Sequence, residues 1–242
     1  MLLAIVLAFL AASTLLVGAA LAMARHWSTR TIGLIAGFGV GALISSLTLD
    51  LTESAFAEAG APAVALGLAA GAIVYSAGNW ALHKGGPGRH RKRSGGQQEG
   101  AGALGIVLGT ILDGIPESIV IGISLLASEA IGLSFLIAVA ISNLPEAMSA
   151  TTGLRRAGWS AAHVYRLWAG VALVSALSAG LGYLLLADAP PGLTATIEAF
   201  AAGAILTMLA DTMMPEAFDD AGPAVGLATV LGYALGALLT LV

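Results

Sequence analysis

The chain contains 242 residues, of which 58% are hydrophobic and only 10% are charged, and its mean hydropathy is +0.93. Soluble domains are about 45–50% apolar and about 25% charged, so this composition excludes a soluble globular enzyme, a disordered tail and a nucleic-acid binder. Cysteine is absent, which excludes disulfides, thiolate metal ligands and a cysteine nucleophile.

Eight apolar stretches are each long enough to cross a bilayer as a helix, which takes about 20 residues. They cover residues 2–24, 33–57, 61–82, 103–127, 130–153, 163–187, 194–218 and 223–242. The first lacks a basic n-region and is too long for the apolar h-region of a typical signal peptide, so we expect a retained helix. The Gly-, Arg- and Gln-rich segment 84–102 predicts a flexible loop. The pattern indicates an all-α polytopic membrane protein, with residues 1–242 as a single transmembrane domain.

All ten Lys and Arg residues fall on one side of these spans. They are Arg25, Arg30, Lys84, Arg89, Arg91, Lys92, Arg93, Arg155, Arg156 and Arg166. The opposite breaks carry Glu58, Glu129 and Asp188 and no basic residue. The positive-inside rule predicts that the basic side is cytoplasmic, so that both termini face outward. We expect a multi-pass protein of the plasma membrane in this orientation.

Residues 41–60 and 203–222 align without gaps, and seven of the twenty positions are identical. Phe56 matches Phe218, Gly60 matches Gly222, and Pro-Ala-Val follows both segments with a one-residue offset. The two segments belong to the second and seventh spans, which cross in opposite directions. The match indicates an inverted repeat of spans 1–3 and 6–8 around spans 4 and 5, an architecture of secondary transporters. Chance similarity between two helices rich in Ala, Gly and Leu is the alternative.

The two central spans each place a Pro-Glu pair near mid-span. The fourth contains Asp113-Gly114-Ile115-Pro116-Glu117-Ser118, and the fifth contains Ser142-Asn143-Leu144-Pro145-Glu146-Ala147. Ionised at the bilayer centre, Asp113, Glu117 and Glu146 together would cost about 7–10 kcal/mol. Their spacing puts the polar side chains of each span on one helix face. A cation, water or bound protons must offset this cost.

Each proline also removes a backbone donor. Pro116 frees the carbonyl of Leu112, and Pro145 frees that of Ile141. Broken helices at membrane depth line cavities, and their free carbonyls bind cations. Carboxylates, an amide and free carbonyls without a buried Lys or Arg predict a divalent-cation site. Its candidate ligands are Asp113, Glu117, Asn143 and Glu146, with Ser142 as a further one. The alternatives are protonated carboxyls that only join helices, and a proton relay.

Further acids outline a path on either side of that site. The candidate pathway residues are Asp50, Glu53, Asp211 and Glu216. We interpret Asp219 and Asp220 as solvated charges. The methionines Met208, Met213 and Met214 are typical of packing. The four histidines, which are His26, His83, His90 and His163, fall in or near the basic loops and are interpreted as solvated.

At the Pro-Glu residues the chain resembles the ZIP family of divalent-metal transporters. That family has eight helices, a variable cytoplasmic loop between the third and fourth, and a His-Asn-x-Pro-Glu-Gly motif in the fourth with a related motif in the fifth. Residues 113–118 and 142–147 occupy the two motifs, and 153–158 and Pro215-Glu216 also fit the family pattern. The resemblance implies a homodimer and alternating access of the elevator or rocking type.

The chain departs from the family motif at positions that influence which metal ion the site prefers. Asp113 replaces the histidine, Gly114 replaces the asparagine, and Ser118 and Ala147 replace the motif-end glycines. The sixth span lacks the acid that members with two metals carry, so we expect one principal metal site. Oxygen-only sites suit harder ions such as Mn²⁺, and imidazole favours Zn²⁺. We predict Zn²⁺, the family default, as the transported substrate, with Mn²⁺ or Fe²⁺ as competitors and no resident cofactor.

The leading interpretation is a secondary transporter of divalent cations, not an enzyme. Residues 143–146 also look like the Pro-Glu repeats of calcium/cation exchangers. A proton-coupled transporter, an intramembrane metal-dependent enzyme that acts on lipid, and a non-catalytic membrane partner remain as alternatives. The chain has no Gly-x-x-x-x-Gly-Lys-Ser/Thr loop, which argues against ATP-driven pumping.

Overall fold

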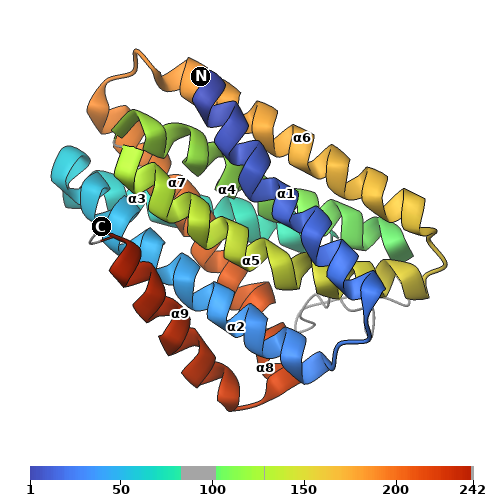
Figure 1. The fold of residues 1–242 in the computed structure, drawn as a ribbon. Coiled ribbons are helices and arrows are strands. Elements are labelled where there is room, and N and C mark those ends of the chain that lie inside the picture. Colours follow the sequence, from blue (N-terminus) through green and yellow to red (C-terminus); the bar gives the residue numbers. More distant parts are fainter. Residues whose placement is uncertain (83–101, 128, 241–242) are drawn as a thin grey trace.

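The computed structural model describes residues 1–82, 102–127 and 129–240. In chain order its elements are α1 (Leu2–Ala24), α2 (Thr29–Ser46), η1 (Leu47–Thr52), α3 (Glu53–Leu82), α4 (Gly102–Ala127), α5 (Glu129–Arg156), α6 (Ala161–Leu186), α7 (Pro191–Met208), η2 (Leu209–Met213), α8 (Met214–Ala221) and α9 (Ala224–Thr240) (Figure 1). No strand occurs in these ranges, which confirms the all-α class. Residues 83–101 lie outside the described residues. They include all of the predicted loop 84–102 except Gly102, and with it His83, His90, Lys84, Arg89, Arg91, Lys92 and Arg93.

Within the described residues, six helical stretches are long and apolar enough to cross a membrane. They are Leu2–Ala24, Thr29–Ala81, Val107–Leu126, Leu133–Arg156, Ala161–Leu186 and Pro191–Ala221. The helix Ala224–Thr240 is apolar but shorter. The predicted multi-pass membrane protein is confirmed at this level of detail.

The stretch Thr29–Ala81 is 53 residues long, which would extend about 80 Å as a straight helix. It is not straight, because the backbone leaves helical geometry at Gly60, with φ 74° and ψ 165°. Only glycine adopts this conformation readily. The predicted break between 57 and 61 is therefore a one-residue turn inside α3. Gly222, with φ 67° and ψ −155°, separates α8 from α9 in the same way.

The two mid-span prolines do not break their helices. α4 continues through Pro116 and α5 continues through Pro145. The predicted broken helices are therefore wrong for these two elements, since each ring is accommodated within a long packed helix. Proline still cannot donate a hydrogen bond, so Leu112 and Ile141 lack their usual helical donor.

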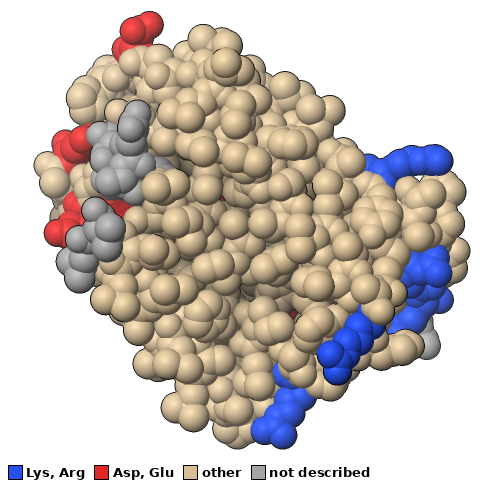
Figure 2. Space-filling model, viewed as in Figure 1, with Lys and Arg blue, Asp and Glu red and all other residues tan. Residues whose placement is uncertain are grey.

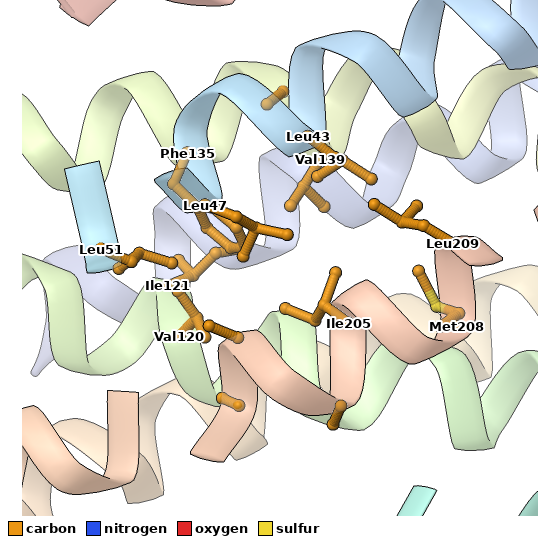
Figure 3. Packing of buried hydrophobic residues seen from close by; sticks show 14 of the residues in the cluster. Leu43, Leu47, Leu51, Val120, Ile121, Phe135, Val139, Ile205, Met208 and Leu209 are labelled. Carbon is orange, nitrogen blue, oxygen red and sulfur yellow. The ribbon is translucent and has the colours of Figure 1, made fainter. Parts of the chain in front are cut away.

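The helices pack as two groups. The ion-site group contains α1, α4, α5 and α6. The other long helices form two pairs, α3 with α7 and α2 with α9, which meet through η1 and η2; together with the short α8 we call them the second group. The groups meet where α2 packs on α5 and α4 packs on α7. The largest apolar core lies at this junction, and Figure 3 shows Leu43, Leu47, Val139 and Ile205 converging there. The core therefore joins the two groups.

Glycines bring the helices of the second group into backbone contact. A Cβ at Gly41 in α2 would overlap the carbonyl oxygen of Thr229 in α9, and one at Gly203 in α7 would overlap that of Leu68 in α3. A second pair of crossings joins the same helices. A Cβ at Gly232 would overlap the Phe38 carbonyl oxygen, and one at Gly71 would overlap that of Phe200. Small residues of this kind are what allow membrane helices to cross closely.

Charged side chains gather at the two ends of the face that Figure 2 shows. Figure 2 shows Lys and Arg at one end of the molecule and Asp and Glu toward the opposite end, where both termini lie (Figure 1). The described basic residues are Arg25, Arg30, Arg155, Arg156 and Arg166. On the face that Figure 2 shows, few charged side chains lie between these two ends, as suits a surface that faces a bilayer.

Candidate metal-ion site

A small cavity of about 20 Å³ lies inside the ion-site group. Its polar lining residues are Thr110, Glu117 and Ser118 from α4, Asn143 and Glu146 from α5, and Ser175 from α6. Alanine and leucine side chains of α1, together with Gly114, Ile121, Val139 and Val171, complete the wall. A volume of this size admits about one water molecule or one bare ion.

Three of the predicted ligands meet in this cavity. Glu117, Asn143 and Glu146 are 4%, 5% and 5% exposed. No Lys or Arg lines the cavity. The Asn143 amide nitrogen donates to the Ala11 carbonyl at 3.2 Å. The amide oxygen Oδ1 is not used in this hydrogen bond, and it is the atom of the amide that could bind a cation. Two carboxyl groups and one amide therefore line the same cavity, and such oxygen donors are the ligands that hard cations take.

Thr110 is a lining residue that the sequence analysis missed. It is 3% exposed, and its Oγ1 has no hydrogen-bond partner among the described residues. An unpartnered buried hydroxyl costs free energy unless an ion or water binds it. The signal was available, because Thr110 lies seven residues before Glu117 and therefore on the same helix face.

Asp113 lies beside the cavity and not in its wall. The carboxyl is 1% exposed, and its Oδ1 accepts a hydrogen bond of 2.6 Å from the Tyr75 hydroxyl of α3. Asp113 and Glu117 share a helix face, but the first is directed to α3 and the second to the cavity. The Tyr75–Asp113 hydrogen bond therefore links the second group to the ion-site group.

Ser142 lies at the contact between α5 and α2. It is fully buried, and its hydroxyl donates to the Val139 carbonyl at 3.0 Å. A Cβ at Gly39 would lie 2.9 Å from the Ser142 Cα, so the two backbones nearly touch. Ser142 thus adjoins the cavity residue Asn143 but does not line the cavity itself.

The predicted pathway residues occupy different settings. Glu216 in α8 is 7% exposed and accepts a hydrogen bond of 2.8 Å from Ser149, one turn along α5 from Glu146. Asp50 in η1 is 3% exposed and accepts one of 2.5 Å from Ser46. Asp211 in η2 is half-buried and Glu53 is exposed. The hydrogen bond from Ser149 joins Glu216 to α5, a helix that lines the cavity.

Glu198 is a buried acid that the sequence analysis overlooked. It is 3% exposed in α7, and its Oε1 has no partner within the described ranges. It belongs to the second group, away from the cavity wall. Its neighbours in sequence are alanine and isoleucine, so nothing in the pattern singled it out.

The other metal-ligating side chains do not gather. Within the part of the chain that the structure describes, no three His, Asp or Glu residues lie together as a metal-binding group. Met208 and Met213 belong to the apolar core and Met214 packs against it, as predicted. His163 is exposed and shares a hydrogen bond with Ser160. The cavity is therefore the strongest candidate among the described residues.

No protein-family model and no curated protein sequence matches the chain. A function must therefore be argued from the chemistry of the cavity and from how the helices around it are arranged.

The Tyr75 hydroxyl provides a test of the link between the groups. We expect Tyr75→Phe to lower the free energy of unfolding by about 1–3 kcal/mol, because a buried acceptor loses its donor. Thermal unfolding of the purified protein in detergent measures the change. Tyr233→Phe is the matched control, since Tyr233 is 37% exposed in α9. Equal stability of the two variants would contradict the prediction.

Proposed function

We propose that this protein is a secondary transporter that moves divalent metal cations across a membrane by alternating access. Zn²⁺ is the first candidate substrate and Mn²⁺ or Fe²⁺ the next. The observation that carries the proposal is the meeting of Glu117, Asn143 and Glu146 in one buried cavity that no Lys or Arg lines. Buried acids of this kind in membrane helices are costly and are typical of ion pathways.

The donor atoms favour a hard or borderline cation. Two carboxylates, an amide oxygen and the unpartnered hydroxyl of Thr110 supply oxygen only. Such a set suits Mn²⁺ and is compatible with Zn²⁺ or Fe²⁺. The resemblance of residues 113–118 and 142–147 to the ZIP motifs favours Zn²⁺. We therefore keep Zn²⁺ first and expect measurable transport of Mn²⁺.

We propose further that the chain crosses the membrane eight times as an inverted repeat. The turn at Gly60 would divide Thr29–Ala81 into two crossings, and α9 would supply the last. The aligned segments support this with matched local geometry, because η1 and η2 begin at the paired Leu47 and Leu209. Gly60 and Gly222 are also paired and both have positive φ.

The glycine crossings support the repeat more strongly. The alignment pairs Gly41 with Gly203, and both contact a carbonyl of the partner helix. When the alignment is continued beyond the one-residue offset, Leu68 pairs with Thr229. These are the two residues whose carbonyl oxygens lie against Gly203 and Gly41. The α2–α9 crossing and the α3–α7 crossing therefore correspond residue by residue. This reciprocity favours the inverted repeat over chance similarity between two apolar helices.

Alternating access in this architecture would move the ion-site group against the second group. The cavity is lined by α1, α4, α5 and α6 alone, so the ion would travel with one group. The Tyr75–Asp113 and Ser149–Glu216 hydrogen bonds cross the junction and would exchange during the movement. The separation of charge at the two ends favours a cytoplasmic basic end, with the plasma membrane as the location.

The test is uptake of a metal panel by proteoliposomes that contain the purified protein. We expect uptake of Zn²⁺ and then Mn²⁺ above empty liposomes. Asp113→His restores an imidazole beside the cavity, so it should raise the rate ratio of Zn²⁺ to Mn²⁺ severalfold. Asp188→His, an exposed change at the acidic end, is the control.

Each result has a defined meaning. Absence of uptake for every metal, with protein that is folded and correctly inserted, would exclude the proposed transport. Calcium transport in preference to Zn²⁺ would favour an exchanger. An unchanged Zn²⁺ to Mn²⁺ ratio in Asp113→His would mean that this residue does not influence the ion.

A further inference from the structure

A second and larger hollow lies between α4 and α6, on the flank of the ion-site group. Its volume is about 430 Å³. Its lining residues are Ile111, Gly114, Ile115 and Ser118 from α4, and Arg166, Leu167, Gly170, Val171, Val174, Ser175 and Ser178 from α6. We call this hollow the α4–α6 groove.

The groove has the length and the lining of an acyl-chain site. From Arg166 to Ser178 the α6 helix advances about 18 Å, which is close to half of the ~30 Å hydrocarbon core of a bilayer. Ile115 and Val174 on its rim are 41% and 50% exposed, so the groove opens on the flank of the molecule. Ser118 donates to the Gly114 carbonyl at 2.6 Å, which satisfies its hydroxyl. The groove therefore offers apolar surface along most of its length.

One end of the groove carries a positive charge. Arg166 is exposed and, among the described residues, is the one charged residue in the lining of the groove. It belongs to the basic end of the molecule (Figure 2). Tyr165 next to it is 38% exposed, and tyrosines of this kind mark the level of lipid headgroups. A guanidinium at headgroup level binds a phosphate well, because its donors match the phosphate oxygens.

We propose that the α4–α6 groove binds an anionic phospholipid. One acyl chain lies along the groove, and the lipid phosphate pairs with Arg166. Charge complementarity selects the lipid class, since the cytoplasmic leaflet is rich in anionic headgroups and the basic end is the cytoplasmic one under the positive-inside rule. A groove of one-leaflet length with its charge at one end fits this occupant better than a second apolar helix.

The lipid would lie against the ion cavity. Gly114, Ser118, Val171 and Ser175 line both the groove and the cavity. A bound acyl chain would therefore support the wall that carries Glu117. An effect of the lipid on metal uptake rests on the proposed function, whereas the binding of the lipid does not.

Native mass spectrometry of the full chain, released from detergent with added phosphatidylglycerol or phosphatidylcholine of identical acyl chains, tests the site. We expect the wild type to retain phosphatidylglycerol preferentially. Arg166→Gln should lower that retention at least threefold and lower retention of phosphatidylcholine by less, because the choline cation already offsets the charge of its phosphate. Gly170→Leu should lower retention of both lipids, because a Cβ at Gly170 meets no atom within 4 Å and the leucine fills the groove.

Two matched variants serve as controls. Arg30→Gln removes another exposed charge from the basic end, and Gly226→Leu places a leucine at another open helix position. Both should bind lipid as the wild type does. The proposal is overturned if Arg166→Gln and Gly170→Leu retain phosphatidylglycerol fully, or if Arg30→Gln is as defective as Arg166→Gln. It is also overturned if Gly170→Leu instead converts a two-chain particle to a single chain, because a second copy then occupies the groove.

Discussion

Glu146→Gln should abolish metal uptake without weakening the fold. The change keeps the shape of a side chain that is 5% exposed in the cavity and removes one of its two negative charges. Losing one partner of a buried ionic contact costs about 3–5 kcal/mol, and each 1.4 kcal/mol is about tenfold. We expect the initial rate of Zn²⁺ uptake into proteoliposomes to fall by roughly 100-fold or more.

Stability should move in the opposite direction. An ionised carboxylate inside the membrane costs about 2.5–3.5 kcal/mol, so the metal-free Gln variant should unfold at the same temperature as the wild type or higher. Added Zn²⁺ should raise the unfolding temperature of the wild type, because ligands stabilise the state that they bind. That increase should be absent in Glu146→Gln. A simple folding defect would lower the unfolding temperature instead.

Glu198→Gln is the matched control. Glu198 is as buried as Glu146 and undergoes the same change, but it lies in α7 and does not line the cavity. Its variant should retain uptake and the Zn²⁺-dependent increase in unfolding temperature. If Glu146→Gln transports like the wild type while Glu198→Gln does not, the site assignment fails and the second group carries the ion. Glu117→Gln should behave as Glu146→Gln does, since both line the same wall.

Much of the fold follows from hydropathy alone. An apolar run such as 2–24 has one low-energy solution in lipid, a helix with every backbone group paired, and the structure has Leu2–Ala24. The sequence predicts only a short break between the spans 33–57 and 61–82 at this position. One glycine with positive φ is sufficient to turn the chain, so no loop is needed.

The site was predictable in part. The spacing of Glu117, Asn143 and Glu146 puts polar atoms on particular helix faces, and those faces meet in the cavity. Spacing does not say which neighbour a face contacts, so the pairing of Asp113 with Tyr75, from a distant helix, was not predictable. Thr110 was missed because a threonine in an apolar helix normally bonds its own backbone.

The last prediction concerns the glycine crossings. We expect Gly41→Ala and Gly203→Ala each to lower the free energy of unfolding by about 2–3 kcal/mol, because the added methyl group overlaps a backbone carbonyl that cannot move aside. Gly226→Ala is the matched control at an open helix position. It should raise stability by about 0.5–1 kcal/mol, because alanine is the better helix former. Thermal unfolding in detergent measures all three variants.

The comparison between the two crossings tests the inverted repeat itself. If the α2–α9 and α3–α7 crossings correspond, Gly41→Ala and Gly203→Ala should cost the same within about 1 kcal/mol, as equivalent sites in equivalent surroundings do. A large loss at one glycine and none at the other would mean that the crossings are not equivalent. If Gly41→Ala and Gly203→Ala are both as stable as Gly226→Ala, the helices do not approach closely at these glycines. If both variants lose stability by similar amounts while Gly226→Ala gains it, the two crossings are equivalent. The second group would then consist of two matched halves that support the moving ion-site group.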